Sequence, residues 1–241
     1  MENSTNYTID VAELTENDKI LCSDDEKAEN YDYLNDEYDI SLQKKPIYEA
    51  VKRVFDIVAS ALALIILSPV FLITIIAIVI DDPGNPFFSQ ERVGKNGKTF
   101  KIYKFRSMRT DAEEHKKDYL DCNESNGPLF KIAKDPRVTR VGRFIRKTSI
   151  DELPQLINIL KNDMSVIGPR PFIPSEQQLL PDFRLLVKPG LSCYWQIGGK
   201  NSLTEEEQLE LDKKYINERS VSVDIKIILI TLAEVLHLKN S

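Results

Sequence analysis

One long apolar run dominates the pattern of hydrophobic and polar positions along this chain. Residues 57–80, IVASALALIILSPVFLITIIAIVI, form 24 consecutive positions without a charge. At about 1.5 Å per residue, a straight helix of this length would reach roughly 36 Å, more than the roughly 30 Å hydrocarbon core of a bilayer. A buried core helix this long and this uniformly apolar would be unusual in a chain of 241 residues. The run therefore predicts contact with a membrane.

Ser68 and Pro69 interrupt the run in its middle. Proline removes a helical hydrogen bond and its ring clashes with the preceding turn, so we expect a sharp kink, with Ser68 able to bond a carbonyl that the kink frees. Each half then reaches only about 18 Å, which is too short to cross a bilayer. The pattern favours a re-entrant helical hairpin; a kinked single-pass anchor is the alternative.

Basic residues flank the apolar run on both sides. Lys52 and Arg53 precede it, and five cations follow it: Arg92, Lys95, Lys98, Lys101 and Lys104. Positive flanks favour the cytoplasmic side of a membrane, and a segment with both ends on one side must re-enter. Arg53 and Asp56, three positions apart, are expected to pair with each other where this helix enters the membrane.

The pattern after the apolar run predicts a small sheet and several helices. Two alternating aromatic stretches within 87–105 surround Asn96-Gly97, which indicates a β-hairpin with a tight turn. Helical patterns cover 111–121, 154–161 and 204–218. The expected fold class is α+β, mainly helical: a re-entrant kinked membrane helix, a short β-hairpin and amphipathic interfacial helices around a compact cytoplasmic domain.

The last segment, 225–238, predicts one of these amphipathic helices. Its polar side chains fall within one arc of the helix, and the rest of its surface is apolar. The polar residues of the arc are Lys226, Thr231, Glu234 and His237. Such a helix can lie on the protein core or on a membrane surface.

Charge is distributed unevenly and divides the chain further. Residues 1–46 hold 13 acidic and 4 basic residues, a net charge of −9, whereas 47–241 hold 25 acidic and 28 basic residues. The acidic segment lacks apolar periodicity, as is typical of disordered chains. We expect an acidic disordered tail over 1–46, a membrane re-entrant helix hairpin over 47–86 and a cytoplasmic domain over 87–241. The nearly balanced charge after residue 46 indicates no nucleic-acid surface.

Candidate chemistry concentrates in residues 137–171. Five cations precede an adjacent acid pair, Asp151-Glu152: Arg137, Arg140, Arg143, Arg146 and Lys147. Farther along, Gly168-Pro169-Arg170-Pro171 forms a rigid turn with another guanidinium. Arginine bonds phosphate oxygens bidentately, and carboxylates bind divalent cations. The pattern predicts a site for a multiply charged anion with a bridging divalent metal. Three widely spaced cysteines and two histidines exclude a C-x-x-C zinc pair and a His-rich metal cage.

The acid pair also has a structural interpretation. Ser149 and Glu152 have the spacing of a capping box, but Pro154 would then lie inside the helix, where its N–H is needed. Asp151 as the N-cap, with Pro154 in the first turn, fits better. Asp151 would then lie at a helix N-terminus, which favours its ionised form and phosphate binding. A cap and a catalytic group are compatible roles, so both remain open.

From Lys52 to about Leu238, the chain resembles the bacterial sugar transferases, specifically the small monotopic phosphoglycosyl transferases. The matching motifs are Lys52-Arg53-x-x-Asp56, Ser68-Pro69, Gln90-Glu91-Arg92-Val93-Gly94, KIYKFRSM (101–108), Asp151-Glu152-Leu153-Pro154-Gln155, Gly168-Pro169-Arg170-Pro171, Pro189-Gly190-Leu191 and Trp195-Gln196. The acidic tail is outside the resemblance. Larger relatives carry extra transmembrane helices upstream; residues 1–46 show no such pattern, so we expect this chain to resemble the short catalytic-core form.

The resemblance implies a reaction and a place for it. Such enzymes transfer a sugar 1-phosphate from a UDP-sugar to polyprenyl (undecaprenyl) phosphate and release UMP, which initiates capsule, exopolysaccharide, O-antigen or glycoprotein glycan assembly. The implied mechanism is Mg²⁺-dependent, with Asp151 as the nucleophile of a covalent aspartyl-phosphosugar intermediate and Glu152 beside the metal. Arg146 and Arg170 match arginines near the phosphates. The implied location is the bacterial inner (cytoplasmic) membrane, monotopic, with the catalytic domain on the cytoplasmic face.

Other candidate residues have two interpretations each. Lys101 and Lys104 alternate on a strand and could meet a lipid phosphate, or be plain surface lysines. Trp195 could pack in the core or stack on uridine, and Gln196 is expected at the border of the donor site. Asp151 and Glu152 are both expected near the metal. The expected partners are the UDP-sugar donor, the polyprenyl phosphate acceptor, membrane lipid and downstream glycosyltransferases, with no nucleic acid.

Two other functions compete with the enzyme interpretation. One is a membrane-anchored scaffold that recruits glycan-assembly partners through its acidic tail, but Asp151, Glu152 and Arg170 are all present. The other is a soluble enzyme in which the apolar hairpin is buried. No residue of the chain indicates which sugar would be transferred.

Overall fold

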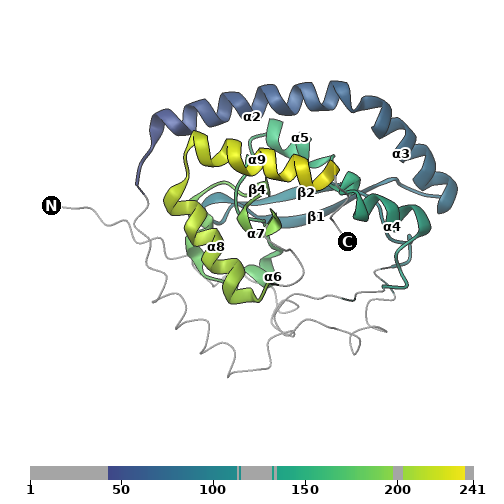
Figure 1. The fold of residues 1–241 in the computed structure, drawn as a ribbon. Coiled ribbons are helices and arrows are strands. Elements are labelled where there is room, and N and C mark those ends of the chain that lie inside the picture. Colours follow the sequence, from purple (N-terminus) through teal and green to yellow (C-terminus); the bar gives the residue numbers. More distant parts are fainter. Residues whose placement is uncertain (1–42, 113, 115–131, 133–134, 198–202, 237–241) are drawn as a thin grey trace.

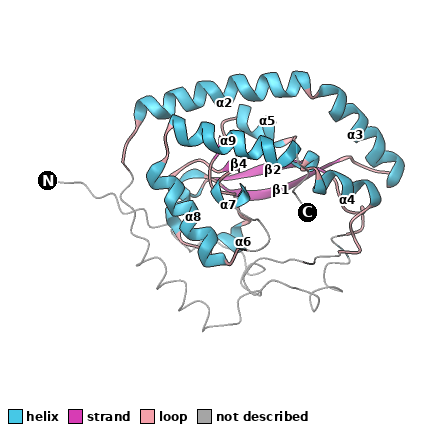
Figure 2. Ribbon diagram, in the orientation of Figure 1, coloured by secondary structure: helices cyan, strands magenta, loops and turns pink. Residues whose placement is uncertain are grey.

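A computed structural model describes residues 43–236, except 113, 115–131, 133–134 and 198–202. Residues 1–42 of the predicted acidic tail, and almost all of the helix predicted over 111–121, lie outside the described residues. Helices form most of the described chain, with two small two-stranded sheets (Figure 2). This arrangement agrees with the expected α+β class.

The apolar run forms two helices with a sharp bend between them. α2 (Pro46–Ile66) and α3 (Ser68–Asp81) meet at Leu67 with an angle of 60° between their axes. Pro69 lies in the first turn of α3, and the Ser68 hydroxyl donates to the carbonyl of Ile65 at 2.8 Å. The predicted kink is confirmed. Among the described residues no single helix has the length and apolar composition to cross a membrane; only the bent pair, taken together, meets both criteria.

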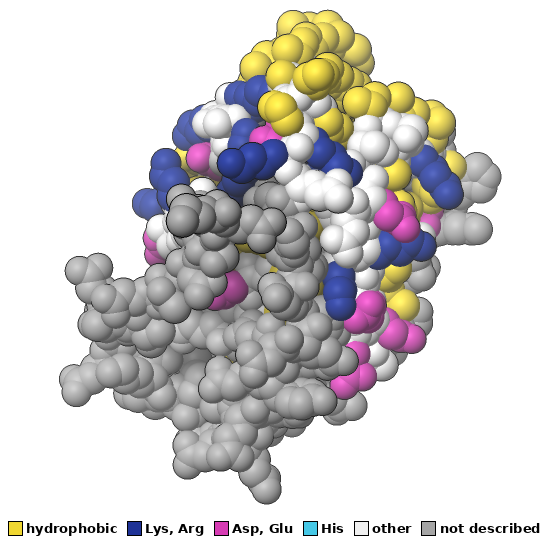
Figure 3. All heavy atoms as spheres, turned by 90° about the vertical axis from the view of Figure 1, so that its left-hand side faces the viewer, with side chains coloured by type: hydrophobic (Ala, Val, Ile, Leu, Met, Phe, Trp, Pro, Cys, Tyr) yellow, Lys and Arg dark blue, Asp and Glu magenta, His cyan; other side chains and the backbone are white. Residues whose placement is uncertain are grey.

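The outer face of α2 and α3 carries exposed apolar side chains. Ile65 and Ile66 are each 70% exposed and Ile80 is 78% exposed. The other exposed large apolar residues of the two helices are Ile47, Val51, Val54, Phe55, Ile57, Val58, Leu62, Leu72, Ile73, Ile76 and Val79. Figure 3 shows apolar side chains gathered at the top of the molecule, with basic side chains below them. The described part of the chain therefore leaves the outer face of the hairpin uncovered, which the soluble-enzyme alternative required to be buried.

The inner face of α2 is fixed to the body by polar contacts. Arg53 donates to the carbonyls of Ile159 at 2.7 Å and Leu160 at 3.0 Å, which lie in the last turn of a helix. Asp56, 2% exposed, accepts from the Ser165 hydroxyl and the Val166 amide. The prediction that Arg53 and Asp56 pair with each other is therefore wrong, because both side chains form hydrogen bonds with groups of the body instead.

The predicted hairpin is confirmed. β1 (Phe87–Val93) pairs antiparallel with β2 (Thr99–Phe105). A single 3₁₀ turn, η2 (Lys95–Gly97), connects them. Asn96 and Gly97 both have positive φ, at 58° and 73°, which Asn and Gly adopt most readily.

A second, parallel sheet was not expected. β3 (Ser165–Ile167) pairs with β4 (Gly190–Ser192), and strands of three residues are too short to show periodicity. The backbones pass so closely at the sheet's end that a Cβ on Gly190 would lie 2.0 Å from the Gly168 nitrogen. Glycine is required there because the second backbone occupies the side-chain volume.

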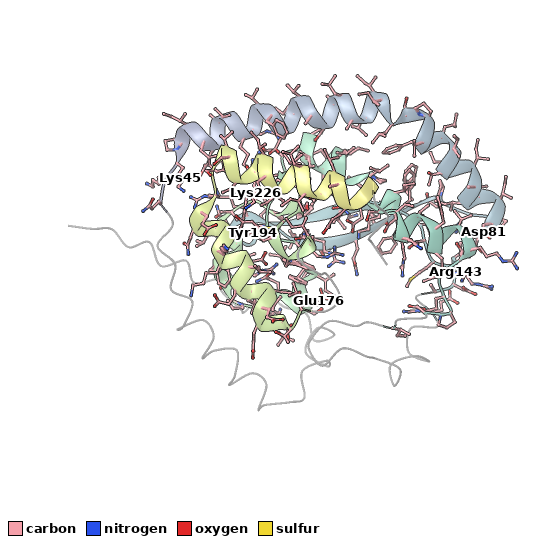
Figure 4. All side chains as sticks on the ribbon, in the orientation of Figure 1. Lys45, Asp81, Arg143, Glu176, Tyr194 and Lys226 are labelled. Atoms are coloured by element: carbon pink, nitrogen blue, oxygen red, sulfur yellow. The ribbon has the colours of Figure 1, made fainter. Side chains whose placement is uncertain are left out.

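The remaining elements surround these sheets (Figure 1). They are α4 (Arg140–Lys147), η4 (Ile150–Glu152), α5 (Gln155–Leu160), α6 (Pro174–Gln177), η5 (Asp182–Leu186), α7 (Tyr194–Ile197), α8 (Glu205–Glu218) and α9 (Val221–Leu236). α5, α8 and α9 confirm the helices expected near those positions, whereas α4 was not predicted. α2 lies along the top of the body in contact with α5 and α9. At the far end, Asp81 and Arg143 lie near each other (Figure 4), and Asp81 accepts from the amide of Val141 in the first turn of α4.

α9 resolves the two arrangements left open for the last helix. Ile227 is fully buried in the core, and Thr231 from the predicted polar arc bonds Ser192 at 2.8 Å. Four exposed apolar residues form one stripe on the helix: Val221, Ile225, Leu229 and Leu232. The helix thus packs on the core and also presents an apolar face to its surroundings.

Candidate active site

The acid pair lies on a short 3₁₀ turn between two helices. Ser149 ends the connection from α4 in the left-handed conformation, with φ 55°, and η4 (Ile150–Glu152) follows. α5 begins only at Gln155, after Pro154. The prediction of Asp151 as a helix N-cap is therefore wrong: Asp151 lies inside the 3₁₀ turn, and the left-handed Ser149 lets the chain reverse before it.

Burial changes the acidity of Asp151. Its residue exposure is 9%, and removal from water raises the pKa of the carboxyl to about 6, with a further increase from the neighbouring charge of Glu152. Lys104, Arg146 and Arg170 act in the opposite direction, because their positive charges favour the ionised form. Asp151 is thus a buried carboxyl with one acidic neighbour and three cations around it.

Glu152 bonds two of these cations directly. Its Oε1 atom lies 2.8 Å from the Lys104 Nζ atom and 3.5 Å from an Arg170 Nη atom. Lys104 is in β2, Glu152 is in η4 and Arg170 follows β3. The structure therefore brings together residues from three distant segments. The sequence predicted Arg170 near the acid pair, whereas the contact of Lys104 with Glu152 was not predicted.

Asn158 sets the position of β2 relative to the acid pair, and the sequence analysis missed it. The Asn158 side chain, fully buried in α5, donates to the Lys101 carbonyl at 2.7 Å and accepts from the Tyr103 amide at 3.0 Å. It thereby occupies the edge of β2 where a third strand would bond. Lys104 follows directly, so this contact aligns its strand with the turn that carries Glu152. The only sign of this role in the sequence was an asparagine among apolar residues of a predicted helix.

Arg146 contributes a cation from α4. Its Nε atom donates to the Ser107 hydroxyl at 2.8 Å, and its charge acts on Asp151. Arg146 is exposed as a whole residue, but partial burial of its guanidinium lowers its pKa, while the charges of Asp151 and Asp135 act in the opposite direction. Ser107 belongs to the KIYKFRSM motif (101–108), but the sequence analysis did not assign it this contact with Arg146.

The other cations before the acid pair do not converge on it. Arg137 forms an ion pair with Asp135 at 2.7 Å, and Arg143 donates to the Val138 carbonyl at 3.1 Å. Arg140 and Lys147 are exposed on α4. The expectation that all five converge is wrong because a helical turn of 3.6 residues distributes them around α4 and its N-terminus.

Three more predicted residues lie apart from the acid pair. Lys101 is exposed and, three positions from Lys104, projects from the opposite face of the strand. Gln196 is 5% exposed in α7, and neither end of its amide has a hydrogen-bond partner among the described residues. Trp195 is also buried, at 8%, which favours packing. The structure shows no contact of these residues with Asp151 or Glu152 within the described part of the chain.

The two carboxylates of the acid pair fit a Mg²⁺ site that would be completed by ligands from the substrate. Mg²⁺ in phosphoryl-transfer sites is held by one or two carboxylates together with substrate phosphates and water. Asp151 and Glu152 offer two adjacent carboxylates, and the described residues contain no group of three or more His, Cys, Asp or Glu that could hold a metal. An ion here would therefore take its remaining ligands from water and a bound diphosphate.

The raised pKa predicts how Asp151 affects stability. A protonated Asp151 is favoured by the fold, so its stabilising contribution is complete below about pH 3.8 and is lost as pH rises to about 6. In metal-free protein, Asp151→Asn should therefore melt at a higher temperature than the wild type above pH 6. The difference should shrink steadily toward pH 4. Thermal denaturation across this range checks it; a difference that does not vary with pH would contradict the burial of an ionisable carboxyl.

Comparison with known proteins gives the family context. The bacterial sugar transferase family model matches residues 47–238. A galactosyl transferase, CpsE, of Streptococcus agalactiae is 49% identical over 189 residues, covering 77% of this chain and 42% of the relative. An exopolysaccharide production protein, ExoY, of Rhizobium meliloti is 37% identical and covers 79% of this chain and 88% of the relative.

The name of a third relative includes undecaprenyl phosphate. An undecaprenyl-phosphate galactose phosphotransferase of Salmonella typhimurium is 42% identical over 197 residues, covering 77% of this chain. The chain spans about two fifths of the length of this relative and of the streptococcal one. The match of the family model extends over most of the chain and includes every residue of the site. The chain belongs to the bacterial sugar transferase family.

Proposed function

We propose that this protein transfers a sugar 1-phosphate from a UDP-sugar to polyprenyl phosphate, with release of UMP, at the start of a surface glycan pathway. The observation that carries the proposal is the buried Asp151 beside Glu152, with cations from β2, α4 and the loop after β3 around it. The names of several relatives support a polyprenyl acceptor. Those names specify galactose, N-acetylgalactosamine or glucose, so they do not single out one sugar.

The proposed reaction has two displacements at one phosphorus atom. In the first, an Asp151 carboxylate oxygen attacks the phosphorus that bears the sugar, the bond from that phosphorus to the bridging oxygen breaks, and UMP leaves. In the second, a phosphate oxygen of the polyprenyl phosphate attacks the aspartyl-phosphosugar, and the carboxylate leaves. A covalent intermediate lets the soluble donor depart before the lipid reacts.

The cations around Asp151 make the first attack possible. A carboxylate approaching a diphosphate meets like charge, and charge develops on the leaving UMP. Arg146 and Arg170 can bond phosphate oxygens, while Lys104 holds Glu152 in place. Asp151 and Glu152 are the residues that would hold Mg²⁺, which when bound neutralises diphosphate charge.

The apolar faces suggest where the reaction takes place. We propose that the bent α2–α3 pair enters the cytoplasmic leaflet of the inner membrane and returns to the same side. The exposed stripe of α9 would lie at the same surface. Arg53 and Asp56 fix α2 to α5 and β3, so a membrane-seated α2 keeps the catalytic turn near the lipid headgroups. The acceptor phosphate could then reach Asp151 while its polyprenyl chain remains in the bilayer.

The bend predicts the topology of the hairpin. Pro69→Leu should restore the helical hydrogen bond that proline removes and straighten the pair, so part of the population should span the membrane. Lys44→Cys and Lys98→Cys, in a background without Cys22 and Cys122, report each end by labelling from the two sides. In the protein with Pro69, both sites should react only from the cytoplasm. Periplasmic labelling of either site would contradict the re-entrant arrangement.

A UMP-release assay tests the proposed function. The full chain, purified in nanodiscs, is incubated with Mg²⁺, undecaprenyl phosphate and each of a panel of UDP-sugars. We expect at least one donor to release UMP, with one lipid-linked sugar diphosphate formed per UMP. A folded protein that releases no UMP with any donor would contradict the proposal and favour the scaffold alternative.

A further inference from the structure

The loop that carries Arg170 is fixed through its backbone. Four successive carbonyls, those of residues 169–172, each accept a hydrogen bond from a different donor. The donors are the Gly190 amide to Pro169 at 2.9 Å, an Arg184 Nη atom to Arg170 at 2.9 Å, an Arg92 Nη atom to Pro171 at 3.3 Å and the Val93 amide to Phe172 at 2.9 Å. Prolines at two of these positions restrict the loop further. Two of the four donors are side-chain guanidinium groups.

The Arg184 guanidinium is also fixed by an ion pair and a ring contact. Arg184 is 4% exposed, and its Nε atom donates to Asp212 of α8 at 2.8 Å; both side chains of this pair are 2% exposed. Its guanidinium also lies 4.3 Å from the centre of the Phe172 ring. A buried ion pair gains little net stability, because desolvation offsets the attraction. The geometry of the fork, which bonds Asp212 with one nitrogen and the loop with another, is what a lysine could not reproduce.

The Arg92 guanidinium is held by two groups of its own. It donates to Gln90 Oε1 at 2.7 Å and lies 3.6 Å from Glu176, a residue of α6 labelled in Figure 4. Arg92 is near enough to Arg170 that burial and this like charge lower the pKa of Arg92 to about 10. Holding two guanidinium groups together costs electrostatic energy, and a bound anion would offset that cost.

Arg170 has few contacts of its own. Its side chain is 37% exposed, and its ion pair with Glu152 is long, at 3.5 Å. The direction of the Arg170 side chain therefore depends on where the loop places its Cα atom. Small displacements of a phosphate-binding group reduce rate strongly, because the reacting atoms must be closely aligned.

We propose that Arg184, held by Asp212, and Arg92 are positioning residues that aim Arg170 at the diphosphate of the donor. This inference rests on the proposed function, since it assigns the donor as the ligand of Arg170. Neither residue touches the acid pair in the described structure; both act through the carbonyls of the loop. Donor use should therefore depend on them, and acceptor use should not.

Arg184→Lys tests the role through a double-mutant cycle. Lysine keeps a positive charge beside Asp212, but one ammonium cannot hold both Asp212 and the loop. We expect kcat/KM for the UDP-sugar to fall about tenfold, which corresponds to about 1.4 kcal/mol, with the KM for undecaprenyl phosphate unchanged. In an Arg170→Ala background, Arg184→Lys should cause no further loss, because there is no side chain left to aim.

Arg219→Lys is the matched control. Arg219 is also 4% exposed and donates to backbone carbonyls, those of Ile216 and Gln43, but not to the Arg170 loop. Its replacement should lower the melting temperature as Arg184→Lys does, without changing kcat/KM for the donor. Arg92→Lys serves as the second test if Arg184→Lys does not fold, since Arg92 is partly exposed. It should likewise lower kcat/KM for the donor on its own and cause no further loss in an Arg170→Ala background.

The outcomes separate this inference from the function on which it rests. UDP binding to Asp151→Asn protein is measured alongside turnover, and it should weaken about tenfold with either lysine variant. An active wild type in which the effects of Arg184→Lys and Arg170→Ala multiply would overturn the positioning role alone. A wild type that neither releases UMP nor binds UDP would overturn the proposed function together with this inference.

Discussion

Asp151→Asn should reduce transfer by at least a thousandfold, or about 4 kcal/mol of activation free energy, while the fold is retained. Asn has nearly the same size but no charge, and it cannot form the acyl-phosphate bond of the proposed intermediate. The neighbouring cations, Lys104, Arg146 and Arg170, are unchanged in this variant. Initial rates of UMP release, with and without undecaprenyl phosphate, measure the effect.

UDP binding supplies the control for this variant. If Asp151 acts only as the nucleophile, the variant should bind UDP at least as tightly as the wild type, because one negative charge near the diphosphate is removed. A variant that fails to bind UDP would indicate a structural role. One that turns over at the wild-type rate would exclude Asp151 as the nucleophile.

Glu152→Gln should have the second largest effect, a loss of about a hundredfold in rate. The amide keeps the shape but loses the charge that bonds Lys104 and Arg170, and amides are weaker Mg²⁺ ligands than carboxylates. The Mg²⁺ concentration for half-maximal rate should therefore rise about tenfold. Rates measured over a series of Mg²⁺ concentrations give both values.

Lys104→Gln is the matched comparison for Glu152→Gln. It removes the other half of the 2.8 Å ion pair but none of the carboxylates. We expect a slower reaction with an unchanged Mg²⁺ requirement. If both variants shift the Mg²⁺ requirement equally, the effect arises from the ion pair, and Glu152 is not a metal ligand.

Features governed by local chemistry could be predicted from the sequence. Pro69 determines the bend because it removes a hydrogen bond wherever the helix is placed. Asn96 and Gly97 form the hairpin turn because these two residues adopt positive φ at little cost. α8, expected over 204–218, begins with a capping box of Thr204 and Glu207, which is also a local pattern. Each of these features depends on residues within a few positions of one another.

Features that depend on distant partners were harder to predict. Arg53 and Asp56 have the spacing of a helical pair, but Arg53 donates to carbonyls of α5 and Asp56 accepts from Ser165 and Val166 of β3. Asp151 resembled a helix cap because the left-handed Ser149 and the 3₁₀ turn were not visible in the residue pattern. Asn158 bonds a strand more than 50 positions away.

The candidate site was predicted in part, for the same reason. The motif resemblance located Asp151, Glu152, Arg146 and Arg170 together, and the structure places Lys104 with them. The other basic residues before the acid pair do not converge on it, since the direction of each side chain depends on its position around α4. Gln196 stays a prediction, because its buried amide has no partner among the described residues.

The intermediate on Asp151 is the central claim, and its direct detection is the sharpest measurement. The enzyme is incubated with Mg²⁺ and a UDP-sugar that supports UMP release, without any lipid acceptor, and is then analysed by intact mass and peptide mapping. The account predicts a mass increase of one sugar phosphate, located on the peptide that contains Asp151, with one UMP released per adduct. It also predicts that added undecaprenyl phosphate removes the adduct. An adduct on another residue, or turnover without any adduct under conditions that trap one, would contradict the account.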